Sequence, residues 1–98
     1  MEIEFENEEL SEIYRGGTTP KGYQPDVIKA FIKTINILAS CKRIEDLYLF
    51  KSLNFEALTN RKGIYSVRAN FKYRIEFSYK NEEALILITI LKLSNHYK

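Results

Sequence analysis

The sequence of 98 residues has one cysteine, one histidine and no long uninterrupted run of apolar residues. Cys41 cannot form a disulfide within the chain, so we interpret it as a small apolar residue of the core. A membrane-spanning helix needs roughly 18 or more apolar residues in succession, and the opening MEIEFENEEL lacks the basic start and apolar segment of a signal peptide. We therefore expect a cytoplasmic protein that does not associate with membranes.

The same scarcity argues against several classes of active site. With one histidine, one cysteine and only a few adjacent acidic pairs, the chain offers no recognisable set of metal ligands. Its four glycines form no Gly-rich phosphate loop, and no Ser-His-Asp triad can be assembled. We expect no bound metal and no cofactor.

The charges are unevenly distributed along the chain. Residues 1–14 hold six of the 13 acidic residues and no lysine or arginine. The other 84 residues hold all 15 basic residues against seven acidic ones, a net charge of +8 that the overall value of +2 conceals. A body this basic is compatible with a polyanionic partner, although a solvated charged surface is the commoner interpretation.

Length and composition predict a single domain over residues 1–98, and the first half of the chain indicates a strand and two helices. Residues 3–5 alternate apolar and acidic side chains, as a short strand does. Asn7 and the pair Gly16-Gly17 have the residue types that begin and end a short helix. Residues 25–40 begin with proline and repeat apolar side chains at helical spacing, and 44–50 suggest a further helical turn.

Three strands are predicted in the second half, over 64–69, 73–79 and 84–93, after an irregular connection at 51–63. Residues 85–91 are apolar at both odd and even positions, which point to opposite faces of a strand. We therefore expect the last strand to be central and covered on both faces. The predicted fold is α+β, with the two helices packed on one face of a mainly antiparallel four-stranded sheet.

The most informative stretch is RANFKYRIEFSY, residues 68–79. Its alternation predicts one apolar face, formed by Phe71, Tyr73, Ile75, Phe77 and Tyr79. If Tyr65 and Val67 share that core, the opposite face collects the remaining side chains, namely Ser66, Arg68, Lys72, Arg74 and Glu76. One Arg–Glu cross-strand pair, contributing roughly 0.2 to 1 kcal/mol, would leave at least one arginine without a partner. Clustered arginines suggest a phosphate site, because the planar guanidinium grips phosphate well.

The C-terminal KLSNHYK places the only histidine, His96, beside Tyr97. A terminal pair of this kind is most often a partly ordered tail. If it folds back beside the arginines, His96 can move protons near neutral pH, and Tyr97 can stack on a base or donate a proton.

Residues 61–79, RKGIYSVRANFKYRIEFSY, resemble the toxins of bacterial type II toxin–antitoxin systems in the RelE/ParE superfamily, most closely its HigB branch. That branch has a Gly-x-(Tyr/Trp)-Ser-x-Arg-x-Asn segment followed by an aromatic-Arg-Ile-x-Phe segment. The matching residues are Gly63, Tyr65, Ser66, Arg68, Asn70, Tyr73, Arg74, Ile75 and Phe77. The length and the order of elements extend the resemblance over nearly the whole chain.

The resemblance implies a RelE-like domain that cuts mRNA on the ribosome without a metal, through attack of a ribose 2′-OH on the adjacent phosphate. It implies catalytic roles for Lys51, Arg68, Arg74, His96 and Tyr97. The expected RNA-binding residues are Lys42, Arg43, Arg61, Lys62, Asn70, Lys72 and Lys98. The implied partners are mRNA on the ribosome and a co-encoded helix-turn-helix antitoxin similar to HigA.

Two departures from the family pattern leave the general acid and base unassigned. Lys51 stands where some members have histidine, and the tail reads Asn95-His96-Tyr97 where some have Asp-Tyr-His. Two alternatives of the same fold remain: a ParE-like toxin that poisons DNA gyrase, and a degenerate member that only binds its antitoxin.

Overall fold

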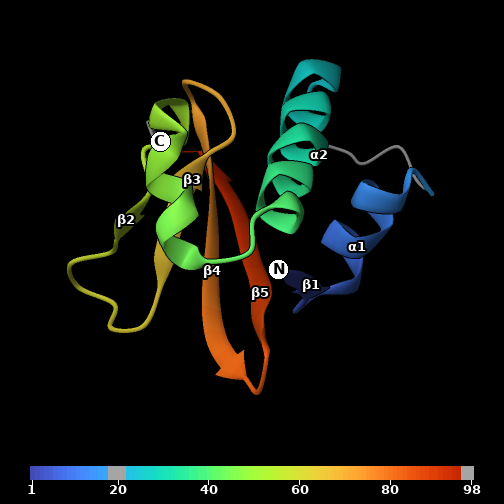
Figure 1. Ribbon diagram of the computed structural model, residues 1–98. Helices are drawn as coiled ribbons and strands as arrows, with labels where there is room; N and C mark the ends of the chain where they lie inside the picture. Colours follow the sequence, from blue (N-terminus) through green and yellow to red (C-terminus); the bar gives the residue numbers. More distant parts are fainter. Residues whose placement is uncertain (18–21, 96–98) are drawn as a thin grey trace.

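The structure is a computed structural model that describes residues 1–17 and 22–95. Its elements are β1 (Glu2–Phe5), α1 (Glu8–Arg15), α2 (Pro25–Ser40), the 3-10 helices η1 (Ile44–Leu49) and η2 (Lys51–Leu53), β2 (Glu56–Ala57), β3 (Tyr65–Arg68), β4 (Tyr73–Glu82) and β5 (Leu85–Asn95) (Figure 1). The longest described helix, α2, has 16 residues, and none of the described helices is long and apolar enough to cross a membrane.

Both predicted helices form, and their ends follow local chemistry. The Asn7 side chain accepts a hydrogen bond from the backbone N–H of Leu10 at 2.9 Å, which caps α1. Gly16 ends the helix in the left-handed conformation, with φ of 74°. Pro25 opens α2, where its missing N–H costs no intrahelical bond. The predicted further helical turn is present as η1.

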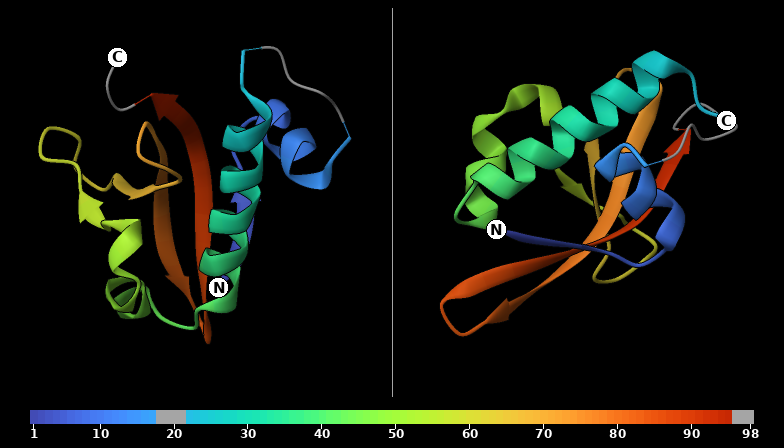
Figure 2. Two further views of the ribbon diagram at one scale, coloured as in Figure 1. Left: turned by 90° about the horizontal axis from the view of Figure 1, so that it is seen from above. Right: turned by 90° about the vertical axis from the view of Figure 1, so that its right-hand side faces the viewer.

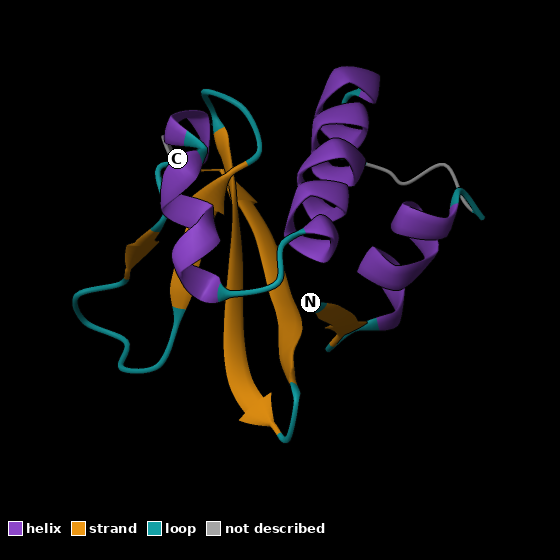
Figure 3. Ribbon diagram, in the orientation of Figure 1, coloured by secondary structure: helices purple, strands orange, loops and turns teal. Residues whose placement is uncertain are grey.

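The sheet has five strands in the order β1-β5-β4-β3-β2, so the predicted number of four is wrong (Figure 3). The added strand, β2, lies in the segment expected to be irregular, and it is too short to show an alternating pattern. The edge strand β1 runs parallel to β5, whereas the other neighbours are antiparallel. The sheet is therefore mixed. The sequence did not reveal the parallel pair, because the apolar pattern of a strand carries no information about its direction.

Figure 2 shows α2 lying along the sheet. One hydrophobic core joins the helices to the inward face of the sheet. Phe31 and Ile35 of α2 are completely buried together with the inward-facing Ile75 and Phe77 of β4. Cys41 lies in the same cluster, as predicted, and it is a free thiol. Because this packing fixes the backbone of β4, it also fixes the positions of the residues on the outward face of that strand.

The predicted central position of β5 is confirmed, because it lies between β1 and β4, but its outward face is only partly covered. Its inward-facing Ile90 is fully buried, but the outward-facing Leu85 is 44% exposed. A register shift follows Ile90: Phe77 pairs with Ile90 and Glu76 with Lys92, so one extra residue lies between them on β5. The bulge moves the inward positions from even to odd numbers.

Candidate functional site

The hairpin of β3 and β4 builds the predicted polar face. Val67 and Ile75 pair across the two strands and are completely buried, so the residues on either side of them point outward. Arg68 is the direct cross-strand partner of Arg74, and Ser66 is that of Glu76. The predicted shared face is thus confirmed for Ser66, Arg68, Arg74 and Glu76, and the two arginines stand opposite each other at the end of the hairpin.

The Glu76 carboxylate organises this face. Its side chain is only 3% exposed, and it accepts a hydrogen bond from Arg61 Nη1 at 2.6 Å. Arg74 Nη2 lies 3.2 Å from the other carboxylate oxygen, to which the Ser94 hydroxyl donates at 3.3 Å. Burial disfavours the charge of Glu76, but the hydrogen bond and charge of Arg61, the charge of Arg74 and the Ser94 hydroxyl outweigh it and lower its pKa. Arg61, expected to bind RNA, is therefore the closest structural partner of this carboxylate.

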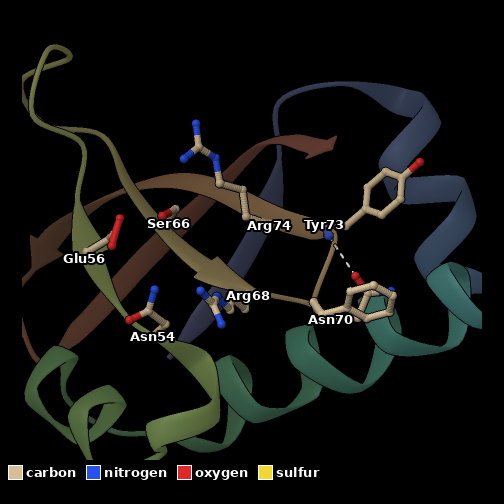
Figure 4. Close-up of a pocket in the computed structure, with 8 residues that line it drawn as sticks. Asn54, Glu56, Ser66, Arg68, Asn70, Tyr73 and Arg74 are labelled. Atoms are coloured by element: carbon tan, nitrogen blue, oxygen red, sulfur yellow. Dashed lines mark hydrogen bonds between the residues drawn. The ribbon is translucent and has the colours of Figure 1, made fainter. Parts of the chain in front are cut away.

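Arg68 contrasts with these paired residues. Its side chain is exposed, and it forms no hydrogen bond or ion pair with any residue in 1–17 and 22–95. Figure 4 shows it near Asn54, with the Arg74 guanidinium projecting away from it. Two carboxylates, Glu56 and Glu76, stand opposite the neighbouring Ser66, and Glu76 already holds two other arginines. Arg68 thus presents an unneutralised guanidinium at the surface.

A surface hollow surrounds this guanidinium. We call it the arginine hollow; it is lined by Asn54, Glu56, Ser66, Arg68, Asn70, Phe71, Tyr73 and Arg74 (Figure 4). Asn54 ends η2 in the left-handed conformation, with φ of 45°. Glu56 lies on β2 and pairs with Ser66. Sequence reasoning missed both, because a two-residue strand has no pattern; the only available signal was the preference of asparagine for left-handed helix ends.

Two of the predicted residues are held by the turn between β3 and β4. The Asn70 side chain accepts hydrogen bonds from the backbone N–H groups of Lys72 at 2.9 Å and Tyr73 at 2.7 Å. β4 begins at Tyr73, as predicted, but Phe71 and Lys72 lie in the turn before it, so the strand faces expected for these two residues are wrong. Phe71 is 71% exposed rather than in the core, and Lys72 Nζ lies 5.8 Å from the centre of its ring.

The other predicted cations are not brought to the arginine hollow. Lys51 is exposed at the start of η2, and Lys62 is exposed in the turn before β3. The backbone N–H groups of Lys42 and Arg43 both donate to the Asp46 carboxylate at the start of η1, at 3.2 Å each. His96, Tyr97 and Lys98 lie outside the described residues.

The chemistry available in the arginine hollow is that of a phosphate site with a proton acceptor. Arg68 supplies positive charge, Ser66 and Asn54 supply polar groups, and Glu56 supplies a carboxylate. Among residues 1–17 and 22–95, no group of three or more His, Cys, Asp or Glu side chains is arranged to hold a metal ion.

Replacing Glu76 with Gln is expected to destabilise the domain at neutral pH by about 1 to 3 kcal/mol, because charge-assisted hydrogen bonds to a buried group are lost. Since folding lowers the pKa of Glu76, its stabilisation is complete above the unfolded value of about 4.3 and is lost as the pH falls through the folded value. Urea denaturation should therefore show a difference between wild type and Glu76→Gln that is constant from pH 7 down to the unfolded pKa of about 4.3 and shrinks as the pH falls further.

Glu82→Gln is the matched control, because this carboxylate lies 3.8 Å from Lys80 and both side chains are largely exposed. Its effect should stay within about 0.5 kcal/mol at all pH values. A difference for Glu76→Gln that persists undiminished in acid would contradict the assigned ion pairs.

Comparisons with known proteins bear on the fold and the family. A family model described as "RelE-like toxin of type II toxin-antitoxin system HigB" matches residues 3–90. Among solved structures, the YoeB/ParE toxin from Agrobacterium tumefaciens is similar, with a TM-score of 0.57 and 14% identity over 99% of this chain and 100% of that one. That likeness shows the fold, and no curated protein matched the chain. The chain thus belongs to the HigB-like family of RelE-like toxins of type II toxin–antitoxin systems.

Proposed function

We propose that this toxin is an endoribonuclease that cleaves mRNA on the ribosome without a metal ion. The observation that carries the proposal is Arg68, an exposed guanidinium with no partner among the described residues, set in a hollow that also contains a carboxylate. A fixed positive charge of this kind stabilises the extra negative charge that a phosphate acquires during cleavage. Membership of the family supports the toxin role and implies a protein antitoxin as partner.

The proposed reaction is an intramolecular transfer. The ribose 2′-oxygen forms a bond to the adjacent phosphorus while the bond to the 5′-oxygen breaks, leaving a 2′,3′-cyclic phosphate and a free 5′-OH. Arg68 holds the phosphate oxygens, and Glu56, on the facing strand, accepts the proton of the 2′-OH. Arg74 assists Arg68 with its charge while remaining paired with Glu76.

The 5′-oxygen must gain a proton as its bond to phosphorus breaks. We propose His96 or Tyr97 as the donor of this proton. These residues follow Asn95 in the sequence, and Asn95 is the cross-strand partner of Tyr73, which lines the arginine hollow. Lys51 is less favoured, because it does not line this hollow although it lies on the adjoining η2.

The proposed partners follow from the chemistry and the family. The substrate is mRNA in the ribosome, which places the activity in the cytoplasm. The exposed cations Lys42, Lys62 and Lys72 would add attraction to the RNA phosphates. The proposed antitoxin is a helix-turn-helix protein similar to HigA, in keeping with the HigB-like family.

Arg68→Ala should abolish toxicity and lower mRNA cleavage on the order of 10² to 10³-fold, the usual effect of removing one donor to a developing oxyanion. Its stability should match wild type, since the exposed side chain has no partner to lose. Primer extension on mRNA after induction measures cleavage, and thermal unfolding measures stability.

Lys80→Ala is the control for this variant, because it removes one exposed positive charge from the neighbouring strand β4, outside the arginine hollow. It should leave cleavage unchanged. Full cleavage by Arg68→Ala would refute the phosphate role. Toxicity with DNA breaks and uncut mRNA in wild type would instead identify a gyrase poison.

Glu56→Gln tests the proton acceptor. The amide keeps the shape of the side chain but cannot take a proton, so single-turnover cleavage of ribosome-bound mRNA should slow by roughly 10² to 10⁴-fold. Binding to the ribosome should be unaffected, because the variant removes no cation. A wild-type rate would exclude Glu56 and return the role to Lys51 or to the tail.

A further inference from the structure

Phe71 is an exposed aromatic residue on a rigid turn. Its side chain is 71% exposed, although its place in the apolar alternation predicts a core residue. The turn that carries it is closed by the Asn70 side chain and by backbone hydrogen bonds from Ala69 and Asn70 to the carbonyl of Tyr73, at 2.9 and 3.2 Å. The ring is thus held at the surface by the fold rather than by packing.

Phe71 borders two hollows that meet at the same residues. The second hollow, which we call the α2 groove, is lined by Lys33, Thr34, Ile37, Ser52, Leu53, Arg68, Ala69, Asn70 and Phe71. It shares Arg68, Asn70 and Phe71 with the arginine hollow. The surface is therefore continuous from the proposed cleavage site, past the aromatic ring, to the side of α2.

The charges around Phe71 favour an anionic occupant of the α2 groove. The charged residues that line this groove are Lys33 and Arg68, and no acidic residue lines it. Lys72 adds a third cation, with its Nζ 5.8 Å from the centre of the Phe71 ring. An exposed aromatic ring among cations is the arrangement that binds single-stranded nucleic acid, since the bases stack on the ring and the cations follow the phosphates.

We propose that Phe71 is a stacking platform for the base of a nucleotide next to the cleaved phosphate, which then lies in the α2 groove. This inference rests on the proposed ribonuclease function and adds a subsite for a flanking nucleotide. A base on Phe71 would leave its phosphate within reach of Arg68, because both residues line both hollows. Stacking is tolerant of base identity, so the subsite positions the strand more than it reads the sequence.

The test uses programmed ribosomes carrying a short mRNA and compares wild type with Phe71→Ala, Phe71→Leu and Phe71→Tyr. Phe71→Ala should raise the half-saturating toxin concentration by roughly 5- to 100-fold, the range that loss of base stacking gives, with the single-turnover rate at saturation unchanged. Phe71→Tyr should restore binding and Phe71→Leu should not. An abasic nucleotide at the flanking position should weaken wild type but add nothing to the defect of Phe71→Ala.

Leu49→Ala is the control, because Leu49 is also an exposed apolar residue, at 79%, but lies on η1 and lines neither hollow. It should behave as wild type. Normal cleavage by Phe71→Ala, or full rescue by leucine, would overturn the stacking role while leaving the ribonuclease intact. Weakened neutralisation by the antitoxin with normal cleavage would assign the ring to a protein partner and overturn the inference. Absence of cleavage by wild type would refute the proposed function and this inference with it.

Discussion

The buried carboxylate of Glu76 is the contact on which the outward face of the sheet depends. A charged group in this position is costly unless it is paired, and the two arginines and one hydroxyl around it meet that requirement. They come from separate segments: Arg61 from the turn before β3, Arg74 from β4 itself and Ser94 from β5. The ion pairs therefore tie this turn to the centre of the sheet.

The same contact determines which arginine remains available. Arg68 and Arg74 stand directly opposite each other, and like charges so placed repel. One carboxylate oxygen of Glu76 pairs with Arg74 and the other pairs with Arg61. The charge of Arg68 is therefore not compensated by any of the described residues. The sheet thus fixes Arg68 in place, and none of the described carboxylates forms an ion pair with it, which supports the proposed phosphate role.

Asn70 sets the other boundary of the site. By accepting two backbone hydrogen bonds it ends the turn and starts β4 at Tyr73, which puts Phe71 and Lys72 at the surface. Asparagine in this role serves the backbone, so its place in the family motif has a structural reason beside any contact with RNA. The two hollows meet at this turn.

Sequence reasoning was most successful where a pattern repeats over several residues. The caps of α1, the apolar spacing of α2 and the expected burial of Val67 with Ile75 predicted both helices and the common outward face of Arg68 and Arg74. Periodicity failed where a feature is shorter than its own period. The two-residue β2 and the single-residue bulge in β5 have no repeating signal.

Long-range features were also hidden from the sequence. The parallel pairing of β1 depends on where the chain returns, which the strand pattern does not record. Arg61 lies 15 residues before Glu76, and only the folded sheet shows that it is the partner of this carboxylate. The place of Glu56 in the arginine hollow is likewise visible only in the folded sheet, because it depends on the pairing of β2 with β3.

Side-chain NMR of the arginine Nε–Hε groups tests the central claim most directly, namely that Arg68 is available for phosphate while Arg61 and Arg74 serve Glu76. The titrant is a short 2′-O-methyl oligoribonucleotide at low salt, which presents phosphates but has no 2′-OH to attack. The account predicts that the Arg68 signal shifts with increasing oligonucleotide while the Arg61 signal stays in place. A shift of Arg61 with Arg68 unchanged would contradict it.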